Sequence, residues 1–182
     1  MILGRSSKKV PRTLHGPPSR SDKTRLFNQL NEAFAYEYLV DEGRQNVRFV
    51  EEDKANKAPD IEFTVKDRKQ FCEVKSIGIT DNEIFNRYGV GTPTKSDRPA
   101  SYQSLGEPFF KKLEGVLEVA RDQIESVRSE GIVFILVRFD DICLDYFGSY
   151  LLEIENFCRT TSADSLVIKA FKYDEVVTCW SS

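Results

Sequence analysis

The chain has 182 residues, of which 40% are hydrophobic and 30% charged, and its formal net charge is −3. This length suits about one domain of roughly 100 to 200 residues, and the composition excludes a wholly disordered, collagen-like or disulfide-dense chain. The longest apolar run, 132–137, is too short to span a bilayer, and the N-terminus lacks the apolar region of a signal peptide. We therefore expect a cytoplasmic protein with no membrane partner.

Histidine and cysteine chemistry is largely excluded by the positions of these residues. Cys72, Cys143, Cys158 and Cys179 are far apart, and the single histidine, His15, lies in a segment rich in proline, glycine and serine. The common Cys/His zinc spacings and a histidine base are therefore both missing. A metal would need hard oxygen ligands, which favours magnesium or manganese.

Basic charge is concentrated at the N-terminus. Residues 1–25 contain seven basic residues against Asp22, a net charge of +6, so the remaining chain carries −9. The seven basic residues are Arg5, Lys8, Lys9, Arg12, Arg20, Lys23 and Arg25. We expect a flexible basic arm over 1–22, which could lie along a phosphate backbone, and one domain over 23–182. A solvated tail without a partner is an equally good interpretation of the arm.

The first half of the chain predicts one helix and three strands. Apolar residues recur at helical spacing over 23–41, and Gly43 follows as a stop signal. Residues 46–52 have the composition of a short strand. Residues 60–66 alternate in polarity, and a second strand over 70–77 follows a polar turn, which predicts a hairpin.

The second half alternates helices and strands. Residues 109–127 form an amphipathic pattern, and the apolar run 132–139 predicts a buried strand. A further helix is expected over 149–159 and a final strand over 165–173, whereas 80–108 has no clear periodicity. The order α-β-β-β-α-β-α-β predicts an α/β fold with one mixed central sheet flanked by helices.

The most informative polar pattern lies on the predicted hairpin. Glu73 and Lys75 share one face of their strand because side chains alternate with a period of two. A tight turn around Asp67 and Arg68 would pair residues whose numbers sum to 135. Asp60 would then stand opposite Lys75 and diagonal to Glu73. Such charges are costly to bury unless they pair or hold a cation.

This pattern resembles the motif of the PD-(D/E)xK nuclease superfamily, which has the restriction-endonuclease-like fold. The motif starts with Pro59 and Asp60 and continues, thirteen residues after Asp60, with Glu73 and Lys75 in the next strand. The resemblance covers about 26–139 and implies an αβββαβ core, to which this chain adds a C-terminal helix and strand. From residue 140 onward the chain matches only as a generic helix and strand.

The resemblance also implies roles for these residues. Asp60, Glu73 and the backbone carbonyl of Val74 would hold Mg²⁺, with Mn²⁺ as a possible substitute. Lys75 would orient or polarise the attacking water and offset phosphate charge. Glu32 in the first helix would support this ion or a second one.

Two choices among carboxylates accompany this assignment. The family's first helix often supplies a glutamate, and here it contains both Glu32 and Glu37. Glu32 shares a helix face with Ala35 and Leu39, whereas Glu37 lies off that face, so we choose Glu32. Glu62 lies on the same strand face as Asp60 and is a rival metal ligand.

Other polar residues allow two interpretations. Gln123 in the second helix occupies a region where some family members place a polar substrate contact, although an exposed helix glutamine is the simpler explanation. Tyr88, Lys95, Arg98 and Tyr102 in the long loop would suit a nucleic-acid strand, and ordinary loop residues would have the same composition.

The resemblance implies a metal-dependent nuclease that hydrolyses phosphodiester bonds, with DNA favoured over RNA as its partner. The alternative from another class is a noncatalytic nucleic-acid-binding or assembly module on the same fold. A third hypothesis is an interaction protein whose carboxylates only decorate an α/β domain. The number of metal ions and the oligomeric state stay open.

Overall fold

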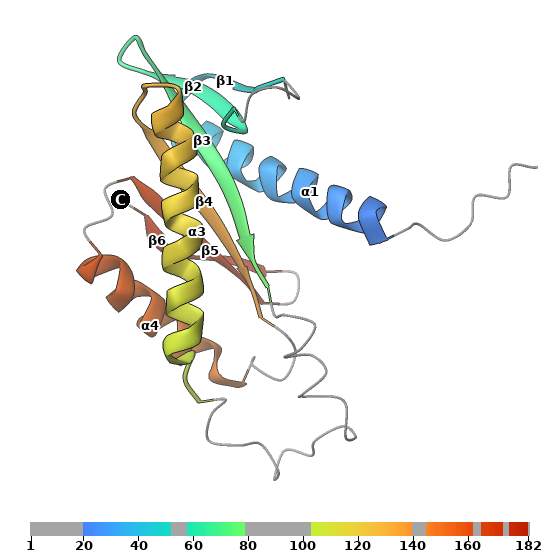
Figure 1. The fold of residues 1–182 in the computed structure, drawn as a ribbon, viewed down its shortest axis with the longest axis vertical. Helices are drawn as coiled ribbons and strands as arrows, with labels where there is room; N and C mark the ends of the chain where they lie inside the picture. Colours follow the sequence, from blue (N-terminus) through green and yellow to red (C-terminus); the bar gives the residue numbers. More distant parts are fainter. Residues whose placement is uncertain are drawn as a thin grey trace, which may run out of the picture.

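The computed structural model describes residues 20–51, 58–78, 103–139, 145–161, 165–172 and 175–181. In chain order, the elements are α1 (Arg20–Asp41), β1 (Gln45–Phe49), β2 (Ile61–Val65), β3 (Arg68–Ile77), α3 (Gly106–Ser126), β4 (Gly131–Arg138), α4 (Phe147–Thr160), β5 (Leu166–Lys172) and β6 (Glu175–Ser181) (Figure 1). No helix in these ranges is both long and apolar enough to cross a membrane.

All six strands of the described chain belong to one sheet, in the order β1-β2-β3-β4-β5-β6. The pairs β1-β2, β2-β3 and β5-β6 are antiparallel, whereas β3-β4 and β4-β5 are parallel. Parallel neighbours need a crossover, and α3 and α4 lie in these two connections. The predicted α/β class with a mixed central sheet is confirmed.

Helices cover both faces of the sheet. The core on one face includes Ala35 and Leu39 of α1, and the core on the other includes Leu117 of α3 and Ile154 of α4. Figure 1 shows α1 on the far side of the sheet from α3 and α4. β4 contributes to both cores because all of its residues 132–137 are buried, which confirms the predicted buried strand.

Several predicted boundaries are wrong. β5 is not the final strand, because β6 pairs with it and forms the edge of the sheet. α1 begins at Arg20, so the last three residues of the predicted arm are helical. α3 begins at Gly106, and Pro108 fits its first turn because no helical N–H partner is needed there. The rest of the arm, 1–19, and most of the long loop, 79–102, lie outside the described residues.

The hairpin register differs by two from the predicted one. Lys66 and Asp67 have φ values of 48° and 64°, the left-handed conformation of a two-residue hairpin turn. Ile61 pairs with Cys72 and Val65 with Arg68, so paired residue numbers sum to 133. Continued by one residue, this register places Asp60 opposite Glu73. The prediction that Asp60 stands opposite Lys75 is therefore wrong.

Candidate active site

Asp60 is held at the start of β2 by two backbone contacts. Its carbonyl oxygen accepts a hydrogen bond from the N–H of Val50 at 2.9 Å, which continues the ladder toward β1. Its carboxylate oxygen Oδ2 accepts the N–H of Val74 in β3 at 2.7 Å. The Asp60 carboxylate therefore lies directly against the central strand that carries Glu73 and Lys75.

Glu73 is a buried carboxylate, with only 1% of its surface exposed. Its Oε1 forms an ion pair with Nζ of Lys75, which confirms that the two side chains share a face. Its other oxygen, Oε2, is buried without a hydrogen-bond partner in the described part of the chain. Burial first, and then the nearby Asp60 carboxylate, raise the pKa of Glu73 to about 7, although Lys75 opposes this shift.

Lys75 is held from two directions. Besides its ion pair with Glu73, its Nζ donates a hydrogen bond to Oε1 of Gln123 in α3 at 2.7 Å. Gln123 is half-buried, so the simpler explanation of an exposed helix glutamine is wrong. The sequence holds a weak signal for this contact, because Gln123 lies next to the stripe that contains the buried residues Ala120 and Ile124.

The other two candidate carboxylates have different surroundings. Glu62 forms ion pairs with Arg48 and with Lys69, the latter at 2.5 Å. Burial acts to raise its pKa, but hydrogen bonds from Lys69 and Arg48 prevail and the pKa of Glu62 is lowered. Glu32 is half-buried on α1, which packs on the opposite face of the sheet from α3. The role of Glu32 in the site stays a prediction.

The donor set of the site fits a hard cation. The Asp60 carboxylate accepts the N–H of Val74, the nearby Glu73 carboxylate pairs with Lys75, and Oε2 of Glu73 is buried without a hydrogen-bond partner among the described residues. Because the N–H and C=O of a strand residue point to the same side, we expect the carbonyl of Val74 to face Asp60 as well. Within the described ranges, no group of three or more His, Cys, Asp or Glu side chains forms a metal cage. Mg²⁺ commonly binds one or two carboxylates and takes its other ligands from water and phosphate.

Several predicted binding residues lie outside the described ranges. These are the loop residues Tyr88, Lys95, Arg98 and Tyr102 and the arm residues Arg5, Lys8, Lys9 and Arg12. The other three basic residues expected in the arm, Arg20, Lys23 and Arg25, belong to α1.

Comparisons with known proteins give no matching family model, no matching curated protein and no matching solved structure.

Proposed function

We propose that this protein is a Mg²⁺-dependent nuclease that hydrolyses phosphodiester bonds, with DNA favoured over RNA. The observation that carries the proposal is a buried carboxylate, Glu73, which is next to Asp60 and ion-paired with Lys75. One of its oxygens has no hydrogen-bond partner in the part of the chain that the structure describes. The succession α1, β1, β2, β3, α3, β4 supports a restriction-endonuclease-like αβββαβ core. Asp60 directly precedes β2 and Glu73 lies in β3, so the two motif carboxylates belong to consecutive strands of this succession.

Asp60, Glu73 and the carbonyl of Val74 would hold the metal ion. When bound, Mg²⁺ supplies a Lewis acid that stabilises the charge developing on the scissile phosphate. The N–H of Val74 fixes the direction of the Asp60 carboxylate. Because the pKa of Glu73 is about 7, this side chain is partly protonated at neutral pH and would release that proton as a cation binds.

Lys75 would act on the reacting groups. Its Nζ is held between Glu73 and Gln123, so the ammonium group has a defined position beside the Glu73 carboxylate. There it can orient the attacking water and counter the negative charge of the phosphate. Gln123 would be a positioning residue, because it contacts Lys75.

The test measures metal-dependent cleavage of labelled single-stranded and duplex DNA by the wild type and by Asp60→Asn, Glu73→Gln and Lys75→Met. Each substitution should lower the turnover number by about 100-fold or more, which is typical for loss of a group that stabilises the transition state. Calorimetry should show a Mg²⁺ site that Asp60→Ala abolishes. Matched controls are Lys69→Met on the same strand and Glu155→Gln, whose carboxylate pairs with Arg159 on α4.

Three outcomes would contradict the proposal. Cleavage that persists in EDTA would exclude a metal-dependent reaction at this site. DNA binding without any cleavage would favour the noncatalytic nucleic-acid-binding module on the same fold. Neither binding nor a response to divalent metal would favour an interaction protein whose carboxylates only decorate the domain.

A further inference from the structure

Helix α1 has apolar residues on two sides, and only one side is buried. Ala35, Tyr38 and Leu39 are buried against the sheet. On the other side, Leu26 is 64% exposed, Leu30 44% and Val40 48%. An amphipathic helix that packs on one sheet normally exposes charged and polar residues on its outer face. This outer face instead has the composition of a contact surface.

The residues of the outer face follow the spacing of a coiled-coil seam. Successive members are alternately four and three residues apart, which is the heptad pattern of positions a and d. They are Leu26, Leu30, Ala33, Glu37 and Val40. This strict period of 3.5 residues is typical of a surface that receives another helix along its length. We call these five residues the α1 seam.

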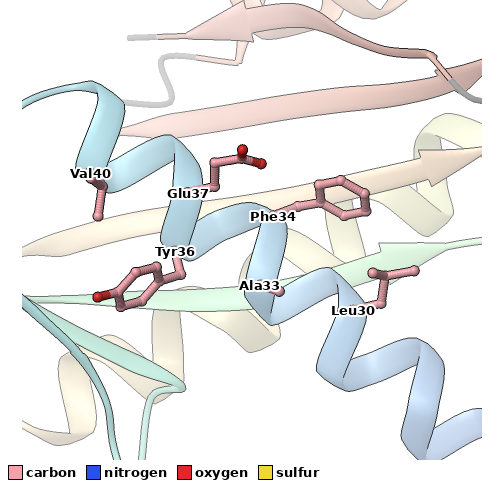
Figure 2. Close-up of a pocket in the computed structure, with 6 residues that line it drawn as sticks. All are labelled: Leu30, Ala33, Phe34, Tyr36, Glu37 and Val40. Atoms are coloured by element: carbon pink, nitrogen blue, oxygen red, sulfur yellow. The ribbon is translucent and has the colours of Figure 1, made fainter.

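A hollow lies on this seam around the small side chain of Ala33 (Figure 2). Its lining residues are Leu30, Ala33, Phe34, Tyr36, Glu37 and Val40. They form two overlapping sets of four residues with the spacing i, i+3, i+4 and i+7. The first set is 30, 33, 34 and 37, and the second is 33, 36, 37 and 40. Four residues with this spacing surround each hole that accepts a side chain from the facing helix in a coiled coil.

The two rims of the hollow are braced by ring contacts. The ring of Phe34 lies 5.1 Å from that of Phe171 in β5, and the ring of Tyr36 stacks on Phe49 in β1 at 5.2 Å. Each rim is therefore supported by a strand of the sheet below. A braced hollow needs little rearrangement to accept a partner, which lowers the free-energy cost of binding.

The charges along α1 favour a second α1 in antiparallel orientation. The first six residues contain Arg20, Lys23 and Arg25 against Asp22, a net charge of +2. The last ten residues contain Glu32, Glu37 and Asp41, a net charge of −3. An antiparallel pair places the basic end of each helix over the acidic end of the other. A parallel pair would place like charges together, which is destabilising.

We propose that a second copy of this chain docks on the α1 seam as an antiparallel helix pair with two-fold symmetry. Leu30 of each copy enters the hole that starts at residue 30 of the other, and Leu26 enters the hole that starts at residue 33. In an antiparallel helix pair, the number of a residue and the mean number of the four residues around it on the other helix add up to a constant. Both pairings fit one register, because this sum is about 63 in each. The two surfaces are identical, so the assembly closes as a dimer. This dimer is independent of the proposed nuclease activity.

The first test measures the solution mass of the full chain by sedimentation at concentrations up to about 100 µM. The wild type should sediment with twice the chain mass, and Leu26→Asp and Leu30→Asp should each raise the dissociation constant at least 100-fold. The matched control is Leu152→Asp, at a leucine of α4 that is 62% exposed, which should stay dimeric. Circular dichroism should show unchanged folding of all three variants, because the three leucines are exposed.

A monomeric wild type across this range would overturn the proposal. The proposal would also be overturned if the Leu30→Asp variant stayed dimeric, or if the Leu152→Asp variant dissociated as strongly as the seam variants. The mass measurement needs no DNA or metal, so its failure is distinct from failure of the proposed nuclease.

The second test determines the orientation with a short thiol-reactive cross-linker in a chain that carries Cys143→Ser and Cys179→Ser. Ala33→Cys should cross-link because residue 33 lies near the two-fold axis. Val40→Cys should not, since about eight residues from the axis on each helix separate the two thiols by about 20 Å or more. Cross-linking of both variants would indicate a parallel pair, and cross-linking of neither would exclude α1 as the interface. Either outcome would overturn the antiparallel arrangement.

Discussion

Ionisation of the Glu73 side chain makes the free energy of unfolding of this protein depend on pH. Its pKa is about 7 in the folded chain and would be near its ordinary value of 4.5 when unfolded. The folded state therefore holds this proton more tightly than the unfolded state does. As the pH rises from 4.5 to 7, ionisation of Glu73 costs the folded state stability, and the full cost is present above pH 7.

We therefore expect Glu73→Gln to stabilise the metal-free protein above pH 7 and to have little such effect below pH 4.5. The free energy of unfolding that the variant gains over the wild type should be larger above pH 7 than below pH 4.5, by about 3 kcal/mol, because each pKa unit corresponds to about 1.4 kcal/mol. Urea unfolding in EDTA at several pH values measures it, with Glu155→Gln as the control. A variant that is less stable than the wild type at pH 8 would show that the Glu73 carboxylate is not destabilising.

The contact between Gln123 and Lys75 predicts that two substitutions of Gln123 differ in their effect on the turnover number. Gln123→Leu removes the acceptor 2.7 Å from Nζ of Lys75 and should lower the turnover number about tenfold. Gln123→Glu keeps an acceptor and should retain most of the activity. Single-turnover cleavage measures both variants, and calorimetry should find their Mg²⁺ affinities close to that of the wild type. Equal losses in both variants would contradict a positioning role for Gln123.

Among the secondary-structure elements, β4 begins at Gly131, which pairs with Phe71 of β3. A Cβ atom on Gly131 would clash with the backbone oxygen of Phe71 in β3 and would lie 3.0 Å from Cγ2 of Ile124 in α3. Backbone cannot move away as a flexible side chain can. Only glycine therefore fits at this point of the β3-β4 pair.

Gly131→Ala should accordingly lower the free energy of unfolding by about 2 kcal/mol or more. Gly115→Ala is the matched control, since a Cβ atom there meets nothing within 4 Å. Because alanine favours a helix interior over glycine, this control should stabilise the chain by about 0.5 to 1 kcal/mol. Urea midpoints of the two variants compare them directly, and equal shifts would contradict the strand contact.

For the whole molecule, the basic arm and the candidate site predict separate effects. The four basic residues before α1, Arg5, Lys8, Lys9 and Arg12, could contact phosphates independently of sequence. Each phosphate contact steepens the fall of duplex-DNA affinity with salt by about 0.9 in log–log slope. Deleting 1–19 should therefore weaken binding and flatten its salt dependence, while cleavage at saturating DNA survives.

Fluorescence anisotropy at several salt concentrations measures this effect, and the deletion leaves α1 complete. An unchanged affinity and salt slope would make the arm a solvated tail. Loss of saturated cleavage in a folded deletion variant would show that the arm also contributes to the reaction.

The elements that could be inferred from the sequence alone are those with a clear local pattern. The period of two over 60–66 and 70–77 predicted the hairpin, and the apolar run at 132–137 predicted a buried strand. The shared face of Glu73 and Lys75 follows from the same period. Such features depend only on which residues of one element point the same way. The edge strand β6 is not among the predicted elements, because the predicted strands end with 165–173.

The contacts between elements depended on tertiary structure. The turn at Lys66 and Asp67 shifted the hairpin register by two residues, and this shift brings Asp60 opposite Glu73. The packing of α3 brings Gln123 to Lys75 from 48 residues away. Packing also selects which apolar side of α1 is covered, because both sides have helical periodicity and only one can face the sheet. Periodicity shows which side chains share a face, whereas the fold determines what they meet and hence the burial and pKa of Glu73.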